Sequence, residues 1–168
     1  MARLASWSVW AMLLAGSGCG VGSTAMISDP VVVDLPELSV QVDTPRSWTV
    51  RHEPQHNRSL FFLGAEGDRD HAVIVQRLPK TRTYRAHAER FRQGQEHALD
   101  KITGESDRAE LGVRFETRRS VAKKPDIRKL IYYRDMQGSP FLVDLSAPEP
   151  DFNAALFDAV AKTLRPVD

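Results

Sequence analysis

The chain has almost no cysteine, almost no excess charge and no long apolar run beyond its first twenty residues. Cys19 is the only cysteine among 168 residues, which excludes an internal disulfide and a multi-cysteine zinc site. The 23 Lys and Arg residues against 22 Asp and Glu give a formal charge of +1, whereas nucleic-acid-binding domains are strongly basic. Apolar residues make up 42% and charged residues 27%, as is typical of a folded globular protein. We therefore expect one folded domain with no nucleic-acid partner.

The sequence also lacks the short motifs of known catalytic sites. It contains no P-loop, no dinucleotide-binding glycine fingerprint and no G-x-S-x-G turn. Residues 52–56 match the H-E-x-x-H spacing of zinc proteases, but Pro54 stands inside the helix that this motif requires. Proline there removes a hydrogen bond and costs about 3 kcal/mol. We therefore predict a polar hairpin loop at this segment, and expect no catalytic residue, metal or cofactor in the chain.

The first 18 residues differ from the rest of the sequence. Arg3 is their only charged residue, an apolar run covers residues 7–15, and small residues follow at 16–18. A basic start, a short apolar stretch and small residues at its end are typical of an export signal. The run is too short for a membrane-spanning helix, which needs about 20 apolar residues. We predict a signal peptide at residues 1–18, whose removal leaves 22 basic and 22 acidic side chains.

Cys19 follows this segment and resembles the acylated cysteine of bacterial lipoproteins. Gly18 and Ser17 match the small residues of the lipobox, whereas Gly16 replaces the aliphatic residue usual three places before the cysteine. The resemblance implies that Cys19 is acylated, becomes the first residue of the mature chain and anchors it to the bacterial envelope, facing the periplasm. Gly20, where an aspartate retains lipoproteins at the inner membrane, favours the outer membrane. The alternative is an ordinary secretory signal with an incidental cysteine.

The remaining chain is assigned to a tether at residues 19–35 and one domain at residues 36–168. Alternating apolar and polar residues predict strands in this domain, and apolar residues repeating every three to four positions predict helices. The predicted strands cover residues 38–43, 48–51, 60–63, 72–78, 112–118, 127–134 and 141–145. The predicted helices cover residues 84–102 and, after an N-cap at Asp151, the stretch up to Leu164. This order indicates an α+β domain with an antiparallel sheet.

The pattern resembles the PsbP family, which includes the photosystem extrinsic protein, related Ran-binding import factors and envelope lipoproteins of the DcrB type. The resemblance is carried by the Thr-Pro-x-x-Trp-x-Val stretch at residues 44–50, the helix between two sets of strands and the closing helix. It implies an α/β/α sandwich around an antiparallel sheet, used for binding and assembly rather than for chemistry. Fold alone does not assign a binding residue.

Local positive charge marks one candidate contact surface, which we call the basic tip. It surrounds the turn predicted at residues 123–126 and consists of Lys123, Lys124, Arg128 and Lys129. Such a surface suits anionic headgroups, peptidoglycan carboxylates or an acidic protein. The alternative is a solvated turn whose lysines prevent pairing between sheet edges.

Two functions are compatible with these features. The first is a non-enzymatic, lipid-anchored accessory that binds or positions an envelope complex through a protein partner. The second is a small-molecule or peptide binder, or a hydrolase without a known motif, that uses a pocket between helix and sheet. A cleft that gathers polar groups, such as His52, His56 or His71 with an acid, would favour the second function.

Overall fold

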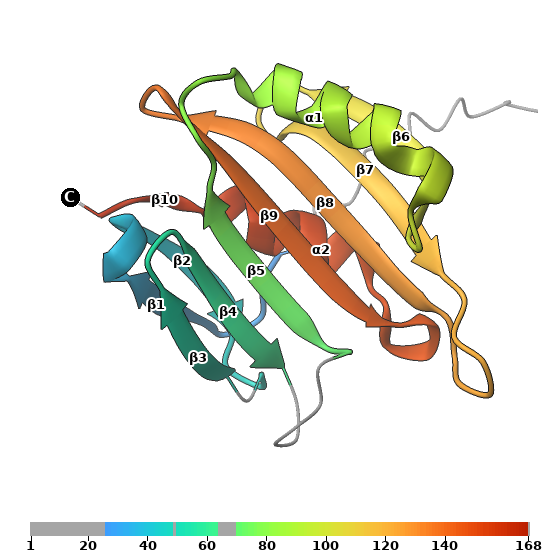
Figure 1. Ribbon diagram of the computed structural model, residues 1–168. Coiled ribbons are helices and arrows are strands. Elements are labelled where there is room, and N and C mark those ends of the chain that lie inside the picture. Colours follow the sequence, from blue (N-terminus) through green and yellow to red (C-terminus); the bar gives the residue numbers. More distant parts are fainter. Residues whose placement is uncertain (1–25, 49, 64–69, 168) are drawn as a thin grey trace, which may run out of the picture.

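The main element of the fold is a seven-stranded antiparallel sheet (Figure 1). The computed structural model describes residues 26–48, 50–63 and 70–167. From edge to edge, the sheet contains β3 (Val50–Gln55), β4 (Arg58–Leu63), β5 (Ala72–Arg77), β9 (Ser139–Pro148), β8 (Ile127–Met136), β7 (Gly112–Arg119) and β6 (Lys101–Arg108). A smaller antiparallel sheet contains β1 (Pro30–Leu35), β2 (Val40–Pro45) and β10 (Arg165–Pro166). The predicted α+β class with an antiparallel sheet is confirmed.

The two helices of the described chain pack on opposite faces of the large sheet (Figure 1). Side chains alternate between the faces along β8, so Ile131 and Tyr133 belong to the core under α1 (Tyr84–Gln93). Leu130 and Tyr132 belong to the larger core beneath α2 (Ala154–Thr163) and the small sheet. The predicted layering of helix, sheet and helix is confirmed, with the small sheet added beside α2.

The predicted helix at 84–102 is too long. It ends at Gln93, a 3-10 turn follows over Gly94–His97, and Ile102 lies on β6, a strand that the prediction missed. Ile102 packs against the same core as α1 but from the sheet, so its helical spacing from Phe91 was coincidental. The other residues of β6 are mostly polar, because it is an edge strand, and therefore show no strong apolar alternation.

The loop predicted at residues 52–56 is wrong. Residues up to Gln55 belong to β3, and the hairpin to β4 turns at His56 and Asn57. Pro54 is tolerated because β3 is at the edge of the sheet, where one side of a strand needs no hydrogen-bond donor. The segment is a strand, so the helix required by a zinc protease motif does not form.

Two predicted boundaries also shift. The tether predicted at residues 19–35 is wrong over its last part, since β1 pairs along its whole length with β2 and Leu35 is fully buried. The second helix begins after Asn153, whose side chain accepts a hydrogen bond from the Leu156 amide at 3.0 Å, and not after Asp151. The predicted signal peptide and Cys19 lie outside the described residues.

Candidate functional site

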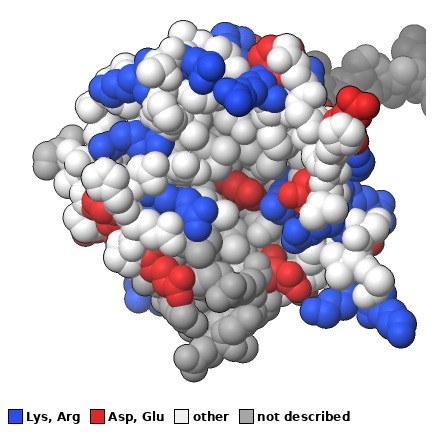
Figure 2. All heavy atoms as spheres, viewed as in Figure 1, with Lys and Arg blue, Asp and Glu red and all other residues white. Residues whose placement is uncertain are grey.

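On one face of the large sheet, the described residues place a helix over only half of the strands. α1 packs on β7 and β8, and no helix of the described chain lies over β3, β4 and β5 on that face (Figure 1). We call this part the open face. Figure 2 shows acidic and basic side chains gathered around a hollow here. The hollow is a cavity of about 390 Å³, within the range of roughly 300–1,000 Å³ typical of small-ligand sites.

Strand register explains which side chains line the cavity. Asp144 on β9 is paired with Ile74 on β5, and Ser146 is paired with Ala72 on β5 and with Lys129 on β8. Paired residues point to the same face of a sheet. The apolar Ala72 and Ile74 of β5 therefore lie beside the polar Ser146 and Asp144 of β9 on the cavity floor. Arg58 and Glu53 from the β3–β4 hairpin form one side of the cavity, and Arg119 and Lys129 from β7 and β8 form the other.

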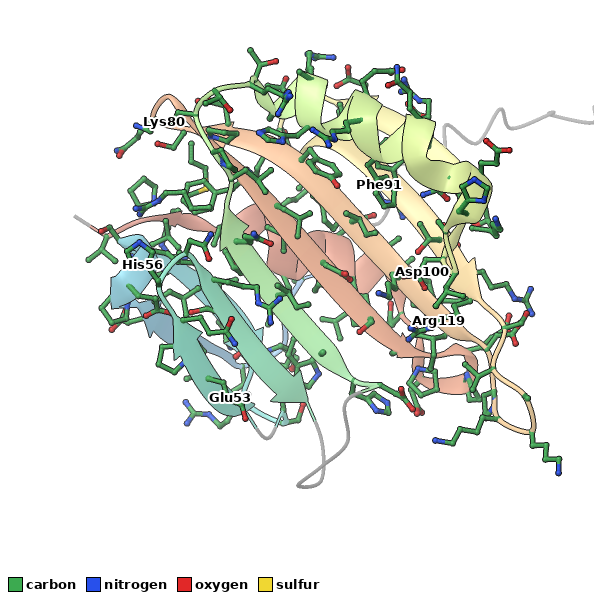
Figure 3. The ribbon with its side chains drawn as sticks, viewed as in Figure 1. Glu53, His56, Lys80, Phe91, Asp100 and Arg119 are labelled. Carbon is green, nitrogen blue, oxygen red and sulfur yellow. The ribbon has the colours of Figure 1, made fainter. Side chains whose placement is uncertain are left out.

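Four side chains on the second side form a compact charged cluster, namely Asp100, Arg119, Lys129 and Asp144. The Lys129 ammonium lies 3.0 Å from Asp100 Oδ2 and 3.5 Å from Asp144 Oδ2. Arg119 Nε lies 3.6 Å from Asp100 Oδ1, and Figure 3 shows these two residues next to each other, across the open face from Glu53. Two positive and two negative groups thus balance one another at the edge of the cavity.

Burial shifts the titration of this cluster. Burial raises the pKa of Asp144 above its ordinary value, and the Lys129 charge opposes this shift only in part. Burial also acts to lower the pKa of Lys129, but the negative charges of Asp144 and Asp100 outweigh it, so the pKa is raised above 10.5. Lys129 is therefore positively charged at neutral pH.

Several buried polar atoms of the site have no hydrogen-bond partner among the described residues. They are Arg58 Nε and Asp144 Oδ1; Arg119 Nε and Asp100 Oδ1 also lack a hydrogen bond but face each other as an ion pair at 3.6 Å. Buried polar groups are nearly always hydrogen-bonded in folded proteins, because leaving one unsatisfied costs about 1–3 kcal/mol. The site therefore retains both donors and acceptors for water or a ligand.

The structure corrects the predicted basic tip. Lys123 and Lys124 are exposed at the β7–β8 turn, as expected. Arg128 forms an ion pair with Glu116 and lies over the Phe152 ring, while Lys129 belongs to the charged cluster at the cavity. Neighbours on a strand point to opposite faces, so Arg128 and Lys129 cannot share a surface with each other. Only two of the four predicted side chains form the tip.

Two of the histidines singled out in the sequence, His56 and His71, do not line the cavity, and the side chain of His52 lies outside the described part of the structure. His71 Nε2 is 3.0 Å from the Asp151 carboxylate, so one of these histidines does have an acidic partner, but neither residue of this pair lines the cavity. His56 is exposed in the β3–β4 turn. Within the part of the chain that the structure describes, no group of three or more His, Cys, Asp or Glu residues could hold a metal ion.

Sequence reasoning missed the residues that do gather at the cavity. Asp144 carried one local signal, because it is the only charged residue in the apolar strand segment 141–145. Arg58 and Arg119 carried none, since polar residues flank them in the sequence, and Asp100 lay inside the segment that was predicted as helix.

Of the comparisons with known proteins, the one with solved structures bears on the fold. No family model and no curated protein matches the chain. The chain is similar to the solution structure of cyanobacterial PsbP (CyanoP) from Synechocystis sp. PCC 6803, with 20% identity, a TM-score of 0.51 and coverage of 90% of this chain and 98% of that chain. A crystal structure from Bacteroides thetaiotaomicron matches with 10% identity and a TM-score of 0.49 over 84% of this chain, which spans about half (49%) of that chain. Among the described residues, none of the helices has the length and apolar character to cross a membrane. The two-helix antiparallel architecture and the similarity to the Synechocystis protein establish that the fold is PsbP-like.

Proposed function

We propose that this chain is a non-enzymatic, lipid-anchored binding protein of the bacterial envelope that holds a small polar ligand on the open face. One observation carries the binding part of this proposal: a cavity of about 390 Å³ lined by half-buried side chains of both charges, with buried hydrogen-bonding atoms left unpartnered at Arg58 and Asp144. A surface that only docks a large partner does not require such a cavity, so we favour the small-ligand binder over the accessory of an envelope complex.

The proposed site of anchoring is Cys19, at the end of the predicted signal peptide. Met26, the first described residue, lies seven positions after Cys19. A fully extended chain of that length spans about 25 Å. An acylated Cys19 would therefore keep the domain close to the membrane, facing the periplasm, with the outer membrane favoured by Gly20.

Cys19→Ser is expected to release the protein from the membrane, because the serine hydroxyl does not accept the lipid that the thiol carries. Metabolic labelling with a fatty-acid probe and fractionation of the envelope measure this effect. Ser17→Ala is the control, since it keeps a small residue before the cysteine and should leave labelling intact. Membrane retention and labelling of the Cys19→Ser protein would contradict the lipid anchor.

Native mass spectrometry tests ligand binding at the cavity. The wild-type protein, purified from envelope extract, is expected to carry an additional small-molecule mass. Ile74→Trp should remove that mass, because Ile74 lies on the cavity floor and the larger ring fills the space. Val32→Trp is the matched control, since Val32 is half exposed on the small sheet. A wild-type protein without any bound mass, or a mass retained in Ile74→Trp, would contradict the proposed function.

A further inference from the structure

We infer that the cavity on the open face takes a zwitterion of dipeptide size, with its carboxylate at Arg58 and its ammonium at Asp144. This inference rests on the proposed binding function and names its ligand class. It is carried by two buried atoms without a hydrogen-bond partner among the described residues: Arg58 Nε, a donor, on one side of the cavity and Asp144 Oδ1, an acceptor, on the other.

The two groups are separated by the cavity floor. Arg58 lies on β4 and Asp144 on β9, with β5 between them. Two strand spacings correspond to about 10 Å. Arg58 is paired with Gln76, and Asp144 with Ile74, so the two positions are also offset along the strands. A ligand lying over Ile74 can therefore reach both groups.

The Arg58 side suits a carboxylate. Arg58 Nε is buried without a hydrogen-bond partner among the described residues, and the guanidinium presents a planar fork that matches a carboxylate. Gln55 is paired with Arg58 and also lines the cavity, so its amide can add a donor. Glu53 on the same side already takes part in an interaction of its own. The positive group that remains for a ligand is Arg58.

The Asp144 side suits an ammonium. Asp144 Oδ2 lies 3.5 Å from the Lys129 ammonium, whereas its Oδ1 is buried without a hydrogen-bond partner. Burial raises the pKa of Asp144, so an additional positive group beside it would stabilise its ionised form. A ligand ammonium supplies up to three donors for this carboxylate. Lys129 is paired with Asp100 and with Asp144 Oδ2, and Arg119 with Asp100, so this cluster has no excess positive charge to repel a ligand ammonium. Asp144 takes part in the cluster through Oδ2 and leaves Oδ1 for the ligand.

The overall balance of charge favours a zwitterion over a singly charged ligand. The charged side chains that line or back the cavity are Arg58, Arg119 and Lys129 against Glu53, Asp100 and Asp144. An anion alone would leave Asp144 Oδ1 without a hydrogen-bond donor, and a cation alone would leave Arg58 Nε without an acceptor, each at the cost of an unsatisfied buried polar atom. A dipeptide separates its terminal charges by one peptide unit more, about 3.8 Å, than a single amino acid. This greater length suits groups that lie two strands apart.

Isothermal titration calorimetry of the purified full chain with alanyl-alanine tests this inference. N-acetyl-alanyl-alanine lacks the ammonium, and alanyl-alanine amide lacks the carboxylate. Each blocked peptide is expected to bind roughly tenfold or more weakly than the unblocked one, because one charged contact is lost. Arg58→Gln should weaken binding of the unblocked dipeptide to a similar extent while leaving the amide unaffected. Asp144→Asn should likewise weaken binding of the unblocked dipeptide and leave binding of the acetylated peptide, which lacks the ammonium, unaffected.

Arg90→Gln is the matched control, because Arg90 is an exposed arginine on α1 and should not change any of these affinities. Equal binding of the blocked and unblocked peptides, or no binding of alanyl-alanine, would overturn the zwitterion assignment. One outcome is that alanyl-alanine does not bind although the wild-type protein from envelope extract carries a small-molecule mass that Ile74→Trp removes. In that case the ligand class is wrong and the binding function holds. If alanyl-alanine does not bind and Ile74→Trp does not remove the bound mass, the ligand class and the binding function are both wrong.

Discussion

Asp158→Ala is expected to lower the free energy of unfolding by about 3–5 kcal/mol, because it breaks a buried charge network between α2 and the large sheet. The Tyr132 hydroxyl donates a 2.6 Å hydrogen bond to Asp158 Oδ1, and Arg114 Nε donates one of 3.0 Å to the same oxygen. Arg108 reaches Oδ2 at 3.3 Å. Tyr132 is fully buried and Arg114 is 9% exposed, so removing the carboxylate leaves the buried hydroxyl without its acceptor and leaves Arg114 with only the Glu116 carboxylate, at 3.9 Å.

The titration of Tyr132 is consistent with this network. Burial first, and then the hydrogen bond to Asp158 and its negative charge, raise the pKa of Tyr132 above its ordinary value. The hydroxyl therefore stays protonated through the neutral range and remains a donor to the carboxylate. Loss of Asp158 would remove this acceptor at every pH at which the protein is folded.

Chemical denaturation monitored by circular dichroism measures the effect of Asp158→Ala. Asp107→Ala is the matched control, because Asp107 is paired with Arg85 and both side chains are about half exposed. Exposed ion pairs contribute about 0–1 kcal/mol, so the control should cost no more than that. Equal losses in the two variants would show that the Asp158 network does not hold α2 on the sheet.

Gly112→Ala is expected to cost about 3 kcal/mol or more, because two penalties coincide at this position. Gly112 begins β7 with a φ of +76°, in the left-handed region that favours glycine. An added Cβ would also lie 2.2 Å from the backbone oxygen of Tyr133 on the neighbouring strand β8. A backbone oxygen cannot move aside as the end of a flexible side chain can, so the β7–β8 pairing must distort.

Gly138→Ala separates the two penalties. Gly138, in the turn between β8 and β9, has a φ of +73°, but nothing lies within 4 Å of the added Cβ. The left-handed conformation alone should cost about 1–2 kcal/mol. Denaturation midpoints of both variants give the difference, which reports the clash with Tyr133. Losses of the same size in both variants would mean that β8 moves away at little cost.

The elements predicted correctly from the sequence were those whose apolar residues repeat at a regular spacing within a short segment. The helix α1 was found from Tyr84, Ala88 and Phe91, because a helix returns every third or fourth residue to the same face. The strands predicted at residues 127–134 and 141–145 were found as β8 and β9, and Gln137 and Gly138 in the turn between them adopt positive φ. Boundaries failed where local and tertiary preferences differed. Pro54 disfavours an interior strand, yet β3 accommodates it because β3 is an edge strand.

The candidate site could not be found in the same way. Lys129 appeared to belong with Lys123 and Lys124 because they are close in the sequence, but the side to which a strand residue points depends on register. Its actual partners, Asp100 and Asp144, lie 29 residues before it and 15 residues after it. No local pattern connects residues at such separations.

What the sequence determined by itself was the α+β class, the antiparallel sheet and the two amphipathic helices, since these follow from the period of apolar residues along short segments. The tertiary structure alone decided the site. β9, the last long strand in the chain, inserts between β5 and β8, and this order brings Asp144 between Arg58 and Lys129. Because strand order depends on packing between segments far apart in the chain, the cavity and its charges became visible only in the folded protein.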